Sequence, residues 1–259
     1  KVNEDVRGAD VFLVQPTCSP VNENLTELLI FIDCLKRASA ARITAVLPYY
    51  GYARKDRKDE GRVPITAKLV ANIITEAGAD RVLTVDLHAA QIQGFFDIPV
   101  DHLLAFPVIS KYFERLVLSD LVVVTPDVGG IKLVRNYSKK LGIKMAIVDK
   151  RRVGPDETEI GFVIGDVANK NVVMIDDLIA TGGSIAQAAN VLKERGAKDI
   201  YVGATHPVFC GSAVEKLSAA PIKEIVVTDT IPLSEKAQGL KDKIKVLSIS
   251  ELLGDAIMR

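Results

Sequence analysis

The sequence predicts an α/β fold in which mainly parallel sheets are flanked by helices. Two observations support this prediction. Short runs of β-branched residues alternate along the chain with longer stretches whose apolar residues recur about every 3.6 positions. Several of the short runs, among them VVVT at 122–125 and VVMI at 172–175, are apolar at nearly every position. Strands of this kind are buried on both faces, as they are in a parallel sheet covered by helices.

Eight strands are predicted from these runs. In chain order they are Val11–Gln15, Ile43–Leu47, Arg81–Asp86, Leu121–Thr125, Lys144–Asp149, Val172–Asp176, Ile200–Ala204 and Glu224–Thr228. Helices are predicted between them from apolar stripes, which are formed by Leu25, Leu28, Leu29, Ile32 and Leu35, by Leu69, Ile73 and Ile74, and by Ala186, Ala189, Val191 and Leu192. Pro64 suits the start of a helix, Gly196 suits the end of one, and Glu251–Met258 has a helical pattern.

The chain is long enough for one large domain or for two smaller ones. Its 259 residues exceed the ~100–200 residues of an average domain, and the predicted strands could form one sheet or two. Pro99 and Pro107 bracket a break after Leu104, and each side of the break holds its own series of strands and helices. We therefore expect two domains, at 1–106 and 107–259.

The composition excludes several classes of protein. With 33 basic and 33 acidic residues, the chain has no broad positive field for nucleic acid or a membrane surface. Its longest apolar runs are far shorter than the ~20 residues of a membrane span. The three cysteines, Cys18, Cys34 and Cys210, are widely spaced and indicate reduced thiols rather than a disulfide framework. The opening KVNEDVRGAD has no apolar signal-peptide core. We expect a cytoplasmic protein.

The most specific motif is VVMIDDLIATGGS at 172–184. A buried strand leads to Asp176 and Asp177, and the TGGS turn at 181–184 then opens a helix. Adjacent carboxylates can accept hydrogen bonds from a vicinal diol, while N–H groups and hydroxyls at a helix N-terminus bind an anion. A diol and a phosphate at that spacing indicate a ribose 5-phosphate. The alternative is an acidic strand end before an ordinary capped helix.

Polar residues follow other predicted strands as well. In TPDVGG at 125–130, the glycines let the backbone approach a ligand closely, and Asp127 is placed to hold Mg²⁺. His88 stands beside an acid at the end of a strand, which favours a ligand or metal role over a structural one. Two basic loops, at 49–62 and 150–152, also follow strand ends. Basic side chains there can neutralise the charge of phosphates, which is the main requirement of phosphoryl transfer.

Together these segments resemble the ribose-phosphate pyrophosphokinase (phosphoribosyl pyrophosphate synthetase) family. The similarity rests on YGYARKDRK, DLHAAQIQGFFDIPVDH, TPDVGG, DKRR, DDLIATGGS and ATHPVFCGSA, and it covers essentially the whole chain. It implies two domains like the type I phosphoribosyltransferases, each a mainly parallel sheet flanked by helices. It also implies a reaction in which ATP and ribose 5-phosphate give AMP and 5-phosphoribosyl 1-diphosphate.

The resemblance implies roles for individual residues. The ribose hydroxyls would be held by Asp176 and Asp177, and the 5-phosphate by Thr181, Gly182, Gly183 and Ser184. ATP would be held by Arg54, Lys55, Asp59 and His88, and the pyrophosphate by a loop of Asp127, Val128, Gly129 and Gly130. The implied cofactor is Mg²⁺, with His88 and Asp127 as its ligands. The implied catalytic residues are Lys150 and Arg152.

The resemblance also bears on regulation and assembly. Arg7, Ser39 and Arg62 match a site between subunits where phosphate activates or ADP binds. The implied partners are ATP, ribose 5-phosphate and further copies of the chain, in a homohexamer built of dimers. The sequence departs from the family at Lys55, which is usually Gln, and at Ala180, which is usually Asp. The family also has a few dozen residues before the position of Lys1, including a segment that contacts adenine in a neighbouring subunit.

Two other functions remain open at this point. A phosphoribosyltransferase that consumes 5-phosphoribosyl 1-diphosphate would explain 107–259 but would leave 1–106 without a role. A non-catalytic homologue that binds an active synthetase should have lost the basic loop or the metal ligands, yet Lys150, Arg152, His88 and Asp127 are all present.

Overall fold

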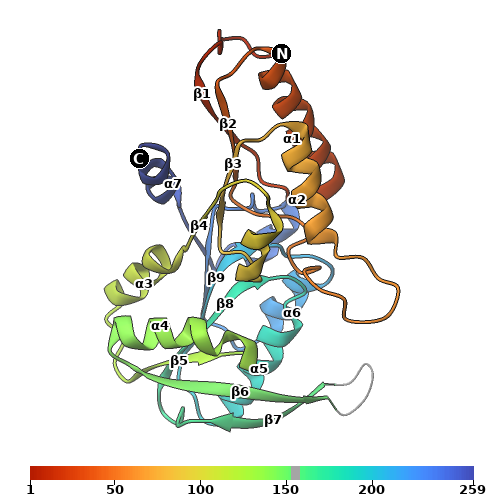
Figure 1. Cartoon of the computed structure of the whole chain (residues 1–259). Helices are drawn as coiled ribbons and strands as arrows, with labels where there is room; N and C mark the ends of the chain where they lie inside the picture. Colours follow the sequence, from red (N-terminus) through yellow and green to blue (C-terminus); the bar gives the residue numbers. More distant parts are fainter. Residues whose placement is uncertain (153–157) are drawn as a thin grey trace. The chain divides into compact units, whose positions relative to one another are not determined.

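The chain forms two compact units (Figure 1). The computed structural model describes residues 1–152 and 158–259, and at 128, 150–152 and 158–161 it describes the backbone alone. The first unit comprises Lys1–Leu104 and Ser250–Arg259, and the second comprises Ala105–Ile249. The last helix therefore belongs to the first unit, whereas the predicted domains are 1–106 and 107–259. The division of functions between those two domains stays a prediction.

The first unit is built on a four-stranded parallel sheet in the order β1-β2-β3-β4. Its strands are β1 (Asp10–Val14), β2 (Arg42–Leu47), β3 (Arg81–Val85) and β4 (Val100–Leu103). Helices α1 (Val21–Arg37) and α2 (Thr66–Ala77) lie side by side in Figure 1 and share one core with the sheet. The 3-10 helix η1 (Ala90–Phe95) joins β3 to β4, and α7 (Ser250–Ile257) ends the chain.

The second unit is built on a seven-stranded sheet in the order β11-β10-β9-β8-β5-β6-β7. Its strands are β5 (Leu121–Thr125), β6 (Lys144–Arg152), β7 (Thr158–Ile164), β8 (Asn171–Ile179), β9 (Ile200–Pro207), β10 (Glu224–Thr228) and β11 (Ile244–Leu247). Only the pairing of β7 with β6 is antiparallel among these strands. The helices are α3 (Phe106–Arg115), α4 (Ile131–Leu141), α5 (Gly183–Glu194) and α6 (Ala213–Ala219), with short 3-10 helices η2 (Val128–Gly130) and η3 (Glu235–Leu240).

All eight predicted strands are present, and the predicted α/β class is confirmed. Strands β4, β7 and β11 were not predicted. The sequences of β4 (VDHL) and β11 (IKVL) are short and contain charged or polar residues, so neither forms an apolar run. In β7, Gly161 interrupts the β-branched pattern. β8 also extends beyond the predicted end at Asp176, because Leu178 and Ile179 still pair with β9.

One predicted apolar stripe is wrong in part. On α2, Ile74 is buried, but Leu69 is 54% exposed and Ile73 is 36% exposed. The buried face of α2 is completed by smaller residues, namely Ala67, Val70 and Ala71. Alanines at this face let the helix approach the sheet closely, so large apolar side chains alone were a misleading guide to its core face.

The described part of the chain contains no helix that is both long enough and apolar enough to span a membrane.

Candidate active site

The central strands of the second unit place the predicted sugar-phosphate residues at one edge of the sheet. β5, β8 and β9 are neighbours and run parallel, so their carboxyl ends meet at the same edge. Asp127 follows β5, and Asp176 and Asp177 lie near the end of β8. The TGGS turn begins at Thr181, two residues after the end of β8. Ligands of open α/β sheets bind beyond this edge.

Two neighbouring carboxylates act on Asp176 at this edge. Burial, followed by the neighbouring carboxylates of Asp177 and Asp127, raises the pKa of Asp176 well above its usual 3.8. The backbone N–H of Asp177 donates to Asp176 Oδ1 at 2.9 Å, which partly offsets this effect. A carboxylate held in such surroundings is stabilised by a ligand that brings hydroxyl donors or positive charge. The arrangement suits a diol, a divalent cation, or both.

The TGGS turn leaves the N-terminus of α5 open to an anion. Within the described chain no side chain caps this helix, and Thr181 and Ser184 are exposed beside its first N–H groups. Gly182 has φ +70°, and a Cβ there would lie 3.1 Å from Leu217 Cγ and 3.3 Å from the Ala213 carbonyl oxygen. Glycine is therefore required for both the backbone angle and the close contact.

The TPDVGG segment folds into a compact turn after β5. Thr125 Oγ1 donates to the Asp127 carbonyl oxygen at 2.5 Å, and the Gly130 N–H donates to Asp127 Oδ1 at 3.2 Å. A Cβ at Gly130 would lie 2.3 Å from Thr125 Oγ1, so only glycine fits. Val128 and Gly129 lie in η2, which leads into α4. The turn holds Asp127 near the β8 carboxylates.

A buried polar network fixes the neighbouring end of β9. His206 Nδ1 lies 2.9 Å from Thr230 Oγ1, which itself donates to the Thr205 carbonyl oxygen at 3.1 Å. Thr228 Oγ1 donates to the same carbonyl at 2.7 Å. His206 is paired in register with Leu178 of β8. The network thus ties β10 to β9, which pairs with β8, the strand before the TGGS turn.

The chain after β9 continues this support. The Phe209 N–H donates to the Ile179 carbonyl oxygen at 2.9 Å, and the Cys210 N–H donates to the Ala180 carbonyl oxygen at 3.0 Å. Ala180, where the family usually has Asp, is therefore held by its backbone immediately before the TGGS turn.

The first unit places His88 after β3. Asp86 has φ +38°, and its N–H donates to the Leu103 carbonyl oxygen at 2.9 Å. The next N–H, of Leu87, donates to His102 Nε2 at 2.9 Å. Burial lowers the pKa of His102, against the opposing effect of Asp86. The neutral imidazole thus fixes the backbone of the turn that carries the exposed His88.

The predicted nucleotide residues lie on the loop at 48–65. Lys55 and Asp59 form an exposed ion pair at 3.7 Å, and Arg54 is exposed as well. Gln91 Nε2 donates to Asp56 Oδ2 at 2.8 Å, which joins this loop to η1. Because η1 begins two residues after His88, the structure brings the basic loop and the His88 turn together within the first unit.

The remaining predicted residues are placed less completely. The backbone of Lys150 and Arg152 forms the end of β6, and their side chains lie outside the described residues. The Gly8 N–H donates to the Ser39 carbonyl oxygen at 2.8 Å, which brings Arg7 close to Ser39. Arg62, in the loop after β2, lies at the opposite end of the sheet.

The prediction of a Mg²⁺ site is not tested by the structure, because the described residues form no preformed metal site. In the described ranges, no group of three or more His, Cys, Asp or Glu side chains is arranged to enclose an ion. His88 belongs to the first unit and Asp127 to the second. Of the two, Asp127 has acidic neighbours, Asp176 among them, that would favour a cation.

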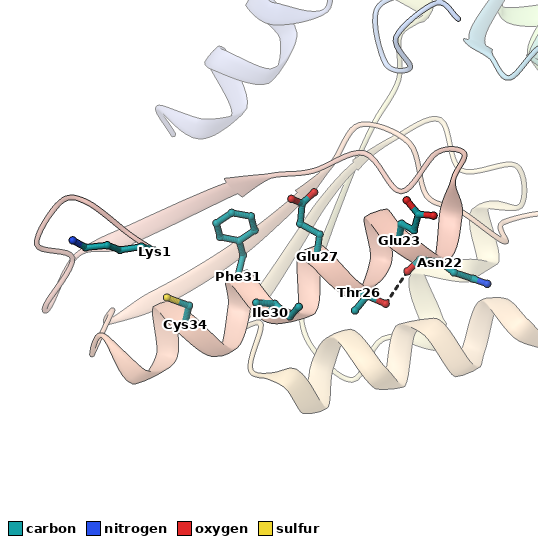
Figure 2. A pocket seen from close by; sticks show the side chains of 8 residues that line it. All are labelled: Lys1, Asn22, Glu23, Thr26, Glu27, Ile30, Phe31 and Cys34. Carbon is teal, nitrogen blue, oxygen red and sulfur yellow. Dashed lines mark hydrogen bonds between the residues drawn. The ribbon is translucent and has the colours of Figure 1, made fainter.

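A hollow of about 640 Å³ lies elsewhere on the first unit, along α1 (Figure 2). Its lining is Lys1, Asn22, Glu23, Thr26, Glu27, Ile30, Phe31 and Cys34. No predicted site residue is among them. The two glutamates would repel phosphate, so this hollow is not a candidate for either substrate.

Comparisons with known proteins identify the family of the chain. Residues 1–78 match the N-terminal domain of ribose phosphate pyrophosphokinase, and residues 151–259 match the phosphoribosyl synthetase-associated domain. The chain is 60% identical over 262 aligned positions to a ribose-phosphate pyrophosphokinase of Rhodopirellula baltica, covering all of this chain and 82% of that protein. The chain belongs to the ribose-phosphate pyrophosphokinase family.

Further relatives extend this result. A ribose-phosphate pyrophosphokinase of Caldanaerobacter subterraneus subsp. tengcongensis is 55% identical, with the same coverage of 100% and 82%. The crystal structure of phosphoribosylpyrophosphate synthetase from Mycobacterium smegmatis is similar with a TM-score of 0.91 at 43% identity, covering all of this chain and 84% of that one. The resemblance predicted from the sequence is confirmed, and so is the prediction that the chain is an enzyme.

Sequence reasoning gave no role to several residues that shape this ribose-phosphate pyrophosphokinase site. His102, His206 and Thr230 are positioned by the pairing of strands that are distant in the sequence. His102 and His206 lie in DLHAAQIQGFFDIPVDH at 86–102 and ATHPVFCGSA at 204–213, which carried the resemblance, whereas Thr230 had only its place after a predicted strand as a signal.

Proposed function

We propose that this chain transfers the diphosphoryl group of ATP to ribose 5-phosphate, giving AMP and 5-phosphoribosyl 1-diphosphate. The observation that carries this proposal is the carboxylate cluster of Asp127, Asp176 and Asp177 next to the open N-terminus of α5. One edge of one sheet thus offers acceptors for hydroxyl groups and donors for a phosphate. Membership of the family supplies the class of reaction.

The second unit takes the sugar phosphate. Asp176 and Asp177 accept hydrogen bonds from the ribose hydroxyls, which relieves the repulsion between their charges. The 5-phosphate lies at the start of α5, where N–H groups and the positive end of the helix dipole face it. The hydroxyls of Thr181 and Ser184 add two further donors.

The first unit takes the nucleotide. Arg54 and Lys55 are exposed on a loop that Gln91 holds next to the His88 turn. The Lys55–Asp59 pair is exposed and therefore weak, so Lys55 can turn to a phosphate at little cost.

Mg²⁺ fits the chemistry of these residues. Carboxylate oxygens are its preferred protein ligands, and the raised pKa of Asp176 reports a site where positive charge is favoured. Asp127 and His88 are the proposed ligands. A divalent cation held there would supply positive charge to offset the negative charge of the phosphates.

The reaction requires positioning and charge neutralisation more than covalent help from the protein. The 1-hydroxyl oxygen of the sugar forms a bond to the β-phosphorus as the bond from that phosphorus to the α,β-bridging oxygen breaks. AMP leaves with the bridging oxygen, and the hydroxyl proton passes to water. Lys150 and Arg152 are proposed to stabilise the charge that develops on the transferring group.

Assembly, regulation and location are part of the same proposal. Arg7 and Ser39 lie at one end of the first sheet and Arg62 at the other, so a regulatory phosphate site containing all three would draw on more than one chain. We propose, from the resemblance, assembly as a homohexamer with phosphate as an activator. Cytoplasmic location is supported by the three free cysteines.

The decisive experiment incubates the chain with Mg²⁺, ATP and ribose 5-phosphate and measures AMP. We expect AMP to form only when both substrates are present, in amounts equal to the 5-phosphoribosyl 1-diphosphate produced. Consumption of 5-phosphoribosyl 1-diphosphate with a free base and without ATP would instead identify a phosphoribosyltransferase. A folded chain that binds ribose 5-phosphate but forms no AMP would overturn the proposed reaction.

A further inference from the structure

Helix α6 forms the support on which the TGGS turn rests. Gly182 lies so close to α6 that an added Cβ would lie 3.4 Å from Ala213 Cα and 3.1 Å from Leu217 Cγ. Both of these residues are fully buried, so the contact is a fixed part of the core. Residues three or four apart lie on one face of a helix, and Lys216, between these two contacts, is three residues from Ala213.

Lys216 directs its ammonium group to the start of α5. Its Nζ lies 3.8 Å from the position that a Cβ on Gly183 would occupy, and Gly183 is the first residue of α5. The side chain is exposed, and the ammonium has no ion-pair partner in the part of the chain that the structure describes. An exposed positive charge therefore lies beside the start of this helix.

The charge balance of the site gives this lysine a role. Asp127, Asp176 and Asp177 make the sheet edge acidic, and the TGGS turn begins four residues after Asp177. A phosphate dianion at the turn experiences that negative field, which the helix dipole, equivalent to about +0.5 of a charge, offsets only in part. The ammonium group of Lys216, beside Gly183, supplies a full positive charge that balances the rest of this negative field.

We propose that Lys216 binds the 5-phosphate of the sugar substrate, with its ammonium completing the anion site at Gly183. The proposal rests on the proposed function, because it concerns the same phosphate, and it names a side chain outside the TGGS motif. Lys216 acts on binding of the sugar phosphate rather than on the transferring diphosphoryl group. Its removal should therefore weaken binding of ribose 5-phosphate and leave the nucleotide side unchanged.

The test compares three variants with the unmodified chain. Lys216→Met removes the charge and keeps the length of the side chain, Lys216→Arg keeps the charge, and Lys198→Met removes an equal charge at the opposite, amino-terminal end of β9. The dissociation constant of ribose 5-phosphate is measured by calorimetry, and KM for each substrate is measured from AMP formation.

We expect Lys216→Met to raise both the dissociation constant and KM for ribose 5-phosphate by about 5- to 10-fold, as for a partly solvated charge-assisted hydrogen bond. KM for ATP and kcat should change by less than about twofold, since the lost contact is uniform binding energy. Lys216→Arg should restore binding, and Lys198→Met should have no effect. The added weakening should shrink as salt is raised from low to about 0.5 M, because ions screen an exposed charge.

An equal dissociation constant for Lys216→Met and the unmodified chain would overturn the inference. So would an equal loss in Lys198→Met, which would indicate a general effect of net charge. The calorimetric arm does not depend on turnover. If AMP is not formed but Lys216→Met still weakens sugar-phosphate binding, the proposed reaction fails and the role of Lys216 stands. Thermal unfolding of each variant verifies that the exposed substitutions leave the fold intact.

Discussion

The two units present their polar residues in different ways. In the second unit, the sugar-phosphate residues lie on or directly after the central strand of a seven-stranded sheet, and hydrogen bonds from β9 hold the segment between them. In the first unit, the proposed nucleotide side chains Arg54, Lys55 and Asp59 are exposed. The backbone of their loop is joined to η1 through the Gln91–Asp56 hydrogen bond and to α2 through the Ala67 N–H, which donates to the Lys55 carbonyl oxygen. The difference indicates a rigid proposed site for the sugar phosphate and exposed, adaptable side chains at the proposed nucleotide site.

The largest expected effect concerns the rigid site. Asp177→Asn should lower kcat/KM for ribose 5-phosphate by about 100-fold or more, because charge-assisted hydrogen bonds to hydroxyls are worth about 1.5–3 kcal/mol each. Steady-state AMP formation checks this. Asp166→Asn is the matched control, since Asp166 is an exposed aspartate of the same unit that pairs only with its own segment, and it should leave turnover unchanged. A similar loss in both variants would remove the distinction between the rigid site and the surface.

A glycine comparison tests the support under the turn. Gly182→Ala should cost more stability than Gly142→Ala, although both positions have left-handed backbone, at φ +70° and +65°. Gly142 has no neighbour within 4 Å of an added Cβ, so its cost is backbone strain alone, about 1–2 kcal/mol. Gly182 adds the clash with Leu217 and Ala213, for about 1 kcal/mol more.

Denaturant unfolding measures the stability of both glycine variants. The KM for ribose 5-phosphate should rise in Gly182→Ala but not in Gly142→Ala. Equal losses of unfolding free energy in the two variants would mean that α6 moves to accommodate the added methyl group. Its contact with Gly182 would then be less rigid than the distances indicate.

The smallest expected effects are changes in stability with pH, which should have opposite signs in the two units. The raised pKa of Asp176 means that its ionised form destabilises the second unit, so Asp176→Asn should be more stable than the unmodified chain at pH 8. That advantage should shrink as the pH falls towards the usual value of 3.8, because the native carboxyl then takes up its proton. The first unit should behave in the reverse sense. The lowered pKa of His102 stabilises it above about pH 6.5, and this contribution is lost as the pH falls.

Thermal unfolding of the unmodified chain, Asp176→Asn and His102→Asn between pH 8 and pH 5 checks both signs. His102→Asn should be less stable than the unmodified chain at pH 8, and this deficit should narrow on acidification. An Asp176→Asn advantage that grows with acid would contradict the assignment of a raised pKa to Asp176.

Much of the rigid site could be predicted from the sequence, because its information is local. The DD pair, the TGGS turn and the TPDVGG turn each follow an apolar run, so the carboxyl ends of parallel strands could be inferred residue by residue. In the structure, Asp127 also lies close enough to the β8 carboxylates to help raise the pKa of Asp176.

What could not be predicted depends on the order of strands in the sheet. His102 acts on the turn before His88 because β3 pairs with β4, a strand whose sequence lacks an apolar run. Thr228 and Thr230 reach β9 because β10 lies beside it. Lys216 could not be singled out from the sequence, because a lysine on a short helix is ordinary. Its position becomes informative only in the structure, where α6 packs against Gly182 and the ammonium group lies close to Gly183. Local sequence patterns indicate where strands end, whereas the order of strands in the sheet depends on the whole chain.

The continued pairing of β8 with β9 has a consequence for the timing of turnover. Register pairs extend to Leu178 with His206 and Ile179 with Pro207, two residues before the turn begins. Moving the turn aside would break backbone hydrogen bonds between β8 and β9 in the middle of the sheet. The free energy needed to break them would slow each catalytic cycle. The proposed sugar-phosphate site should therefore keep its shape from substrate binding to product release.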